Sequence, residues 1–102
     1  MLKKEVNNTN KSNFSLENNL INQLIDKFGK DRQVMQTLEE FSELQKELLK
    51  NINRNKDNKK EILEEFVDVT FMLKQIKAIY NFTDKEIQEE LEHKLSKVAK
   101  LL

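Results

Sequence analysis

Two short apolar stretches of this chain carry carboxylates three residues apart. The two pairs are Glu40 with Glu43, and Glu65 with Asp68. Because positions i and i+3 of an α-helix lie on one face, each pair projects to one side of its helix. If the two helices pack antiparallel, the four carboxylates converge and repel one another. Hard divalent cations such as Mg²⁺ prefer carboxylate oxygens, so the spacing predicts a metal site.

The same spacing also occurs without any function. The chain is 35% charged, and Glu favours helices, so single pairs of this kind arise by chance on solvated helix faces. Here the pattern occurs twice, each time inside an apolar run, with a loop-bearing segment between the two copies. This repetition favours the metal site over a solvated face.

Length and composition limit the classes of protein that need to be considered. The chain has 102 residues, which is enough for one small domain. Its 18 basic and 18 acidic residues balance, so no overall attraction to nucleic acid or to a membrane surface is expected. The chain has no cysteine and one histidine, which excludes disulfides, thiolate zinc sites and a histidine metal cluster. No apolar run approaches the roughly 18 residues of a membrane span, and we expect a cytoplasmic protein.

The chain has no proline and one glycine, which indicates an all-α fold. We expect a flexible arm over residues 1–13 and a helical domain over residues 14–102. Ser15 is the predicted N-cap of a first helix that ends at Gly29, and Asp31 the predicted cap of a second. The run of residues 51–60 is predicted to connect it to a third helix, capped by Asp57 or Asn58.

The third predicted helix, from about residue 62 to residue 80, is the most apolar part of the chain. Its apolar residues cover more than one stripe, so we expect more than one neighbour, including a second subunit. Thr83 and Glu86 form a capping-box signature that opens a fourth helix. Four helices with short connections predict a helical bundle.

The paired motifs, Glu40-x-x-Glu43 and Glu65-x-x-Asp68, resemble those of the MazG family of all-α nucleoside triphosphate pyrophosphohydrolases. The resemblance extends from about residue 16 to the end of the chain. It implies a four-helix MazG-type bundle assembled as a homodimer or a homotetramer. It also implies hydrolysis of (d)NTP between the α and β phosphates, giving (d)NMP and pyrophosphate, with Mg²⁺ or, as a substitute, Mn²⁺.

The resemblance also implies roles for the acidic residues. Glu40, Glu43, Glu65 and Asp68 are the expected metal ligands. Glu39 and Glu43 are the expected catalytic residues: Glu39 would orient a water or accept its proton, and Glu43 would act as a metal ligand. Alternatively, Glu39 is a solvated helix residue with no role in catalysis.

Phosphate groups of a substrate need cationic partners, and Lys94 and Lys97 of the fourth helix are the expected ones. Arg32 and Lys74 are weaker candidates, and any of the lysines can equally be a solvated surface group. Many family members carry an Asn and an Arg downstream, where this chain has Val98 and Leu101.

Candidates for binding the base are Phe28, Gln33 and Gln36, because the family places aromatic and amide side chains of the first helices around it. The spacing of Phe28 also continues the apolar stripe of its helix, so a core position is the alternative. Two other functions stay open from the sequence: a phosphoribosyl-ATP pyrophosphohydrolase, and a non-enzymatic helical interaction module.

Overall fold

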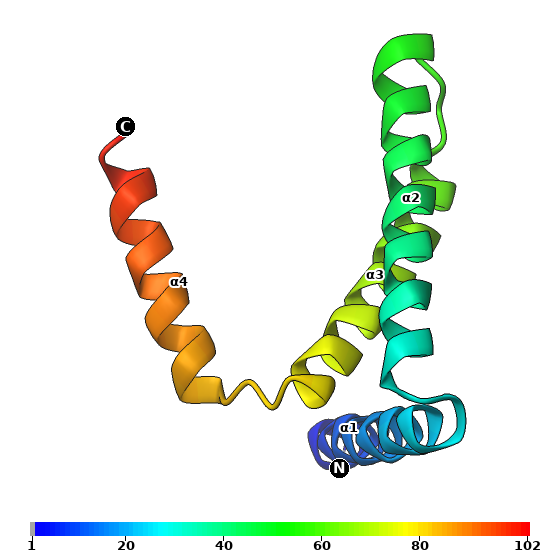
Figure 1. Cartoon of the computed structure of the whole chain (residues 1–102), viewed down its shortest axis with the longest axis vertical. Coiled ribbons are helices and arrows are strands. Elements are labelled where there is room, and N and C mark those ends of the chain that lie inside the picture. The colour runs from blue at the N-terminus through cyan, green and yellow to red at the C-terminus, as the bar shows by residue number, and fades with distance from the viewer. Residues whose placement is uncertain (1) are drawn as a thin grey trace.

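The computed structural model describes the backbone of residues 2–102 and the side chains of residues 14–102. Its four helices are α1 (Leu2–Phe28), α2 (Lys30–Arg54), α3 (Lys59–Ile79) and α4 (Asp84–Ala99) (Figure 1). No strand occurs in residues 2–102, so the all-α prediction is confirmed. None of these helices is long and apolar enough to cross a membrane.

Three residues in the left-handed backbone region separate the helices. Gly29 follows α1 with φ 84°, Asn55 follows α2 with φ 50°, and Asn81 lies between α3 and α4 with φ 56°. Glycine has no Cβ to clash in this region, and asparagine is the residue type that otherwise adopts it readily. The predicted helix end at Gly29 is confirmed.

Three predicted boundaries were wrong. Ser15 lies inside α1, because no proline or glycine precedes it to stop the helix. Asp31 lies in the first turn of α2, and Gly29 takes the N-cap position. The connection predicted over residues 51–60 is only residues 55–58, because α2 continues to Arg54. The flexible arm predicted for residues 1–13 falls outside the residues whose side chains are described.

Helices α2 and α3 form an antiparallel hairpin, and α1 crosses both at the end away from their loop (Figure 1). The buried hydrophobic residues are few: Ile21, Val69 and Met72. Buried polar side chains join α2 to α3 beside them, where Gln33 Nε2 donates to Gln75 Oε1 at 2.7 Å. An interior of this size is small for a chain of 102 residues.

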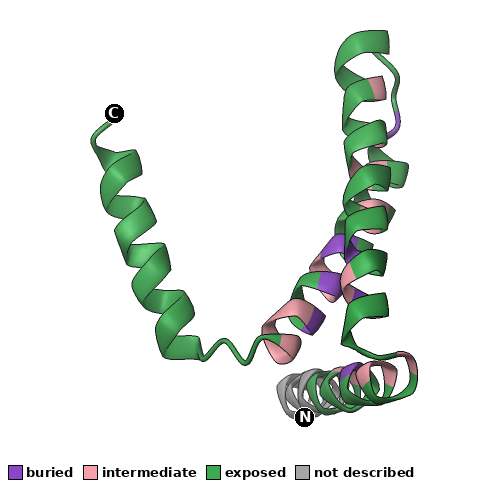
Figure 2. Ribbon diagram, in the orientation of Figure 1, coloured by how far each residue is buried: buried purple, intermediate pink, exposed green. Residues whose placement is uncertain are grey.

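Helix α4 begins with the predicted capping box. The backbone N–H of Glu86 donates to Thr83 Oγ1 at 3.1 Å, and the N–H of Thr83 donates to Glu86 Oε1 at 2.9 Å. Beyond this turn α4 packs on none of the other helices in residues 2–102, and it stands across from the hairpin with every residue exposed (Figure 2). The four predicted helices are therefore present, but only three of them pack together within one chain.

Candidate metal centre on the α2–α3 hairpin

Three of the four predicted ligands come together between α2 and α3. One carboxylate oxygen from each of Glu40, Glu65 and Asp68 lies within 4.8 Å of the other two. Glu40 comes from α2, and the other two are one turn apart on α3. The antiparallel hairpin thus produces the convergence that the spacing predicted for these three side chains.

Glu65 is the centre of this acidic cluster. Its Oε2 is shielded from solvent and has no hydrogen-bond partner among the residues with described side chains. Burial raises the pKa of Glu65, and the neighbouring charges of Asp68, Glu40 and Glu43 raise it further. A shielded carboxylate oxygen without a donor, facing two other carboxylates, has the chemistry of a ligand for a hard divalent cation.

Glu43 lies at the edge of the cluster and is not one of the three converging groups. Its side chain is 52% exposed, and its Oε1 accepts from Lys46 Nζ at 3.4 Å. Its negative charge still acts on Glu65. Glu39 is also exposed, on a different side of α2 from Glu40. Of the two predicted catalytic residues, Glu43 is therefore the one beside the cluster.

A second half-buried carboxylate, Glu47, lies one turn further along α2 and has a different environment. The Asn58 amide nitrogen donates to the Glu47 carbonyl at 2.8 Å and to its Oε2 at 3.3 Å. Lys50 Nζ lies 3.3 Å from Glu47 Oε1. Burial alone would raise the pKa of Glu47, but the hydrogen bonds from Asn58 and Lys50, with the charges of Lys50 and Lys56, lower it.

Asn58 is fully buried and closes the hairpin loop. Its own Oδ1 accepts from Asn51 Nδ2 at 3.3 Å, and Asn51 also donates to the Lys56 carbonyl at 3.2 Å. The sequence predicted Asn58 as a possible cap of α3, and it does occupy the N-cap position, but its side chain makes no capping bond. It binds back to α2 instead, which fixes the loop end of the hairpin near the acidic cluster.

A shallow hollow of about 300 Å³ lies beside Asp68, between α3 and α1. Lys74 also lines it, with its Nζ 2.8 Å from Glu17 Oε1 of α1. Lys74 was a weaker candidate from the sequence, yet it is the lysine that shares a hollow with a member of the cluster. Glu17 belongs to no motif in the sequence, and only its ion pair with Lys74 shows that it lies beside this hollow.

The three predicted base-binding residues have different surroundings. Gln33 is buried and hydrogen-bonded to Gln75, so it presents no free amide. Gln36 is exposed and donates to Glu40 Oε1 at 3.0 Å, which places it against the cluster. Phe28 is half-buried, with the Arg32 guanidinium 4.5 Å from its ring centroid.

The predicted phosphate-binding lysines, Lys94 and Lys97, lie on α4 and are exposed. Because α4 packs on neither α2 nor α3 in residues 2–102, one chain does not bring these lysines to the carboxylates. A role at the acidic cluster would require a different placement of α4.

Comparison with known proteins gives no further assignment. No family model matches the chain, no curated protein matches it, and no solved structure matches it.

Proposed function

We propose that this protein is a Mg²⁺-dependent nucleoside triphosphate pyrophosphohydrolase of the MazG type. The observation that supports the proposal most is the acidic cluster itself. Two helices contribute three carboxylates to one point, and the shielded Oε2 of Glu65 lacks any donor. A purely structural carboxylate in such a position is normally hydrogen-bonded, as Glu47 is.

In this proposal Glu40, Glu65 and Asp68 hold the metal through carboxylate oxygens. When bound there, Mg²⁺ would supply positive charge against the triphosphate and would lower the pKa of a water. Glu43 lies beside the cluster and accepts the proton of the attacking water. The water oxygen forms a bond to phosphorus, the bridging P–O bond between the α and β phosphates breaks, and (d)NMP and pyrophosphate leave.

Contacts to the rest of the substrate belong to side chains around the cluster. Lys74 is the cation best placed for a phosphate, because it lines the hollow beside Asp68. Gln36, bonded to Glu40, and Phe28 are the remaining base-binding candidates. A homodimer or homotetramer in the cytoplasm is part of the same proposal.

The test is release of pyrophosphate from a panel of canonical and modified NTPs and dNTPs, with Mg²⁺, with Mn²⁺ and with EDTA. We expect metal-dependent formation of monophosphate and pyrophosphate by the wild-type chain and by Glu89→Gln, an exposed control on α4. We expect background rates from Glu65→Gln. If the protein turned over phosphoribosyl-ATP and no nucleotide of the panel, the substrate class would change. A folded protein that hydrolyses neither would indicate a non-enzymatic helical module.

A further inference from the structure

Helix α4 carries an apolar stripe that no helix within residues 2–102 covers. Its members recur at helical spacing, and their exposed fractions run from 38% to 55%: Ile87, Leu91, Leu95 and Val98. Side chains at this spacing share one side of a helix. Most of the stability of a helix in a protein comes from packing of its apolar face, and α4 is only 16 residues long. We therefore expect the α4 stripe to pack against another apolar surface.

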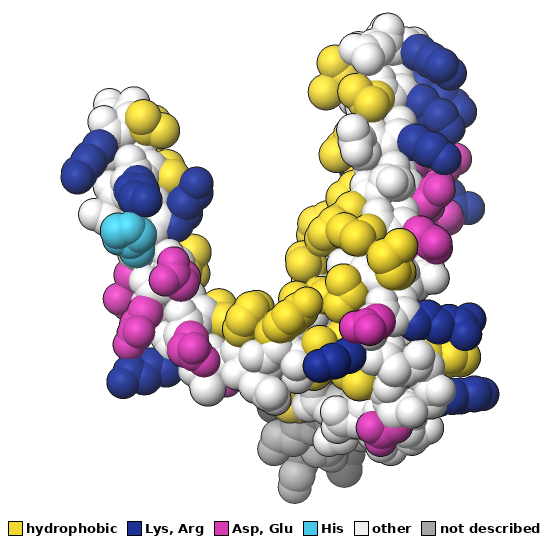
Figure 3. Space-filling view, viewed as in Figure 1, with side chains coloured by type: hydrophobic (Ala, Val, Ile, Leu, Met, Phe, Trp, Pro, Cys, Tyr) yellow, Lys and Arg dark blue, Asp and Glu magenta, His cyan; other side chains and the backbone are white. Residues whose placement is uncertain are grey.

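The α2–α3 hairpin presents a second uncovered surface, which we call the hairpin face. Its large apolar residues are 40% to 59% exposed: Leu38, Phe41, Leu48, Leu63, Phe66 and Leu73. Hydrophobic side chains gather over α2 and α3 on the side that faces α4, with a concave surface between them (Figure 3).

The hairpin face and the acidic cluster lie on different sides of the hairpin. Leu38 is two residues from Glu40, and Phe66 is two residues from Asp68. Two residues along an α-helix turn the side chain by about 200°. A partner that covers the hairpin face therefore leaves the acidic cluster open.

The amount of exposed surface is too large for a folded chain of this size. The accessible surface is 8841 Å² for a mass of 12.2 kDa, whereas a compact monomer of that mass exposes about 6,000 Å². The radius of gyration is 17.1 Å against about 13 Å for a compact chain of this length. The excess exceeds the roughly 800 Å² that each partner buries in a standard protein interface.

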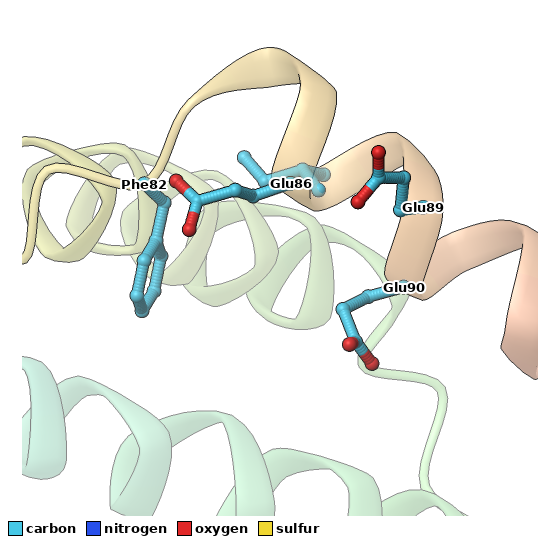
Figure 4. Close-up of a pocket in the computed structure, with 5 residues that line it drawn as sticks. Phe82, Glu86, Glu89 and Glu90 are labelled. Carbon is cyan, nitrogen blue, oxygen red and sulfur yellow. The ribbon is translucent and has the colours of Figure 1, made fainter.

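Side-chain contacts across the turn link the start of α4 to the end of α3. Lys77 of α3 forms an ion pair with Asp84, the first residue of α4, and lowers its pKa. The rings of Tyr80 and Phe82 stack with centroids 5.9 Å apart. Figure 4 shows Phe82 and Glu90 directed to the same side of the chain, around a hollow of about 450 Å³ at the foot of α4.

The charges of α4 are divided between its two halves. The first nine residues carry Asp84, Glu86, Glu89, Glu90 and Glu92, with Lys85 as their one cation, and the end of the helix and its C-cap carry Lys94, Lys97 and Lys100. When two such helices lie antiparallel, the acidic half of each faces the basic half of the other. The helix is thus complementary to a second copy of itself.

We propose that two copies of this chain pair through antiparallel α4 helices, burying each α4 stripe against the partner's α4 and hairpin face. A two-fold axis brings the same patch of both copies together, which satisfies both uncovered surfaces at once. The inference specifies the surface of the proposed homo-oligomer and does not depend on the hydrolase activity. It assigns Lys94 and Lys97 to pairing between copies.

The first test is the mass in solution, measured by analytical ultracentrifugation. We expect the wild-type chain to have twice the monomer mass of 12.2 kDa, or a multiple of that dimer. Leu91→Glu places a charge in the α4 stripe and should weaken association by about a hundredfold or more. Glu89→Lys is the matched control, because Glu89 lies on the side of α4 opposite the stripe, and it should weaken association far less than Leu91→Glu.

The second test reverses charge along one edge of the α4 stripe. Glu90→Lys alone, and Lys94→Glu with Lys97→Glu, should each weaken association by about tenfold. The variant with all three substitutions should associate to within about threefold of the wild type, because its reversed charges again face opposite charges on the partner. Helicity by circular dichroism confirms that each variant is folded.

The outcomes separate the proposals. A monomeric wild-type chain would overturn this inference together with the proposed homo-oligomer. An oligomer that is unaffected by Leu91→Glu, or whose triple variant is no better than the partial reversals, would overturn only the α4 pairing. Absence of pyrophosphate release, with pairing as expected, would count against the hydrolase alone.

Discussion

Glu47 and Glu65 are two half-buried carboxylates on the same hairpin, and they have opposite surroundings. Glu47 accepts hydrogen bonds from Asn58 and an ion pair from Lys50, and its pKa is lowered. Glu65 faces Glu40 and Asp68, has a shielded oxygen without a donor, and its pKa is raised. Both residues have the same type, helical context and degree of burial.

The difference between them separates a structural carboxylate from a candidate site. The protein's own donors already stabilise the charge of Glu47, so that residue needs no ligand. Glu65 carries a charge that the chain leaves uncompensated, and a divalent cation would compensate it. Four predictions test this contrast, in order of decreasing expected effect.

The largest difference is expected in catalysis. Glu65→Gln removes a proposed metal ligand and should lower pyrophosphate release by on the order of a hundredfold or more, since even residues behind the ligands cost 10- to 100-fold. Glu47→Gln keeps an acceptor for Asn58 and should retain most of the activity per folded molecule. Initial rates at saturating Mg²⁺ measure both variants. Equal losses would remove the distinction between the two residues.

Loss of Asn58 should destabilise the protein strongly, because the fully buried amide satisfies two oxygens of Glu47. Asn58→Ala should lower the free energy of unfolding by about 1–3 kcal/mol. The control is Asn53→Ala at an exposed position of α2. Urea denaturation measures both, and a cost for Asn58→Ala no larger than that of the control would contradict the structural role of Glu47.

Addition of Mg²⁺ should raise the melting temperature of the wild-type chain. At ten times its dissociation constant, a ligand that binds only the native state adds about 1.4 kcal/mol. For a domain of this size the midpoint then moves by roughly 5–10 °C. Differential scanning calorimetry should show this shift for Glu47→Gln and none for Glu65→Gln. A full shift in Glu65→Gln would place any bound metal elsewhere.

The pH dependence of stability without metal should show opposite signs for the two residues. Because the pKa of Glu65 is raised on folding, its contribution is favourable below the unfolded-state pKa and is lost as pH rises through the folded-state pKa. Because the pKa of Glu47 is lowered, its contribution is present above the unfolded-state pKa and is lost as pH falls through the folded-state value.

Urea titrations across mildly acidic and neutral pH, in EDTA, provide the check. Glu65→Gln should become more stable than the wild type as pH rises, and Glu47→Gln should become less stable. If both variants changed in the same direction, the two carboxylates would not differ as the structure indicates.

Much of the local structure could be predicted from the sequence. The left-handed stop at Gly29 and the capping box of Thr83 follow from residue chemistry within a few positions, and both are present. The convergence of Glu40, Glu65 and Asp68 also follows, because helical spacing and an antiparallel hairpin determine it. The first two features depend on neighbours close along the chain, and the third on helical spacing in two helices joined by a short loop.

Features that depend on contacts between distant residues could not be predicted. The spacing of Glu43 matches that of a ligand, but its side chain is exposed and pairs with Lys46. Gln33 is turned inward because Gln75, 42 residues away, offers an amide partner. The place of α4 depends on contacts that helical periodicity does not specify, so a packed four-helix bundle was expected where only three helices pack within residues 2–102.

Direct titration with Mn²⁺, followed by electron paramagnetic resonance, tests the central claim, that Glu65 and its neighbours form a metal site and Glu47 does not. The wild-type chain and Glu47→Gln should bind Mn²⁺ at one site per chain, and Mg²⁺ should displace it. Glu65→Gln should not bind Mn²⁺ at the same concentrations. Equal binding by all three proteins, or none by the folded wild-type chain, would contradict the account.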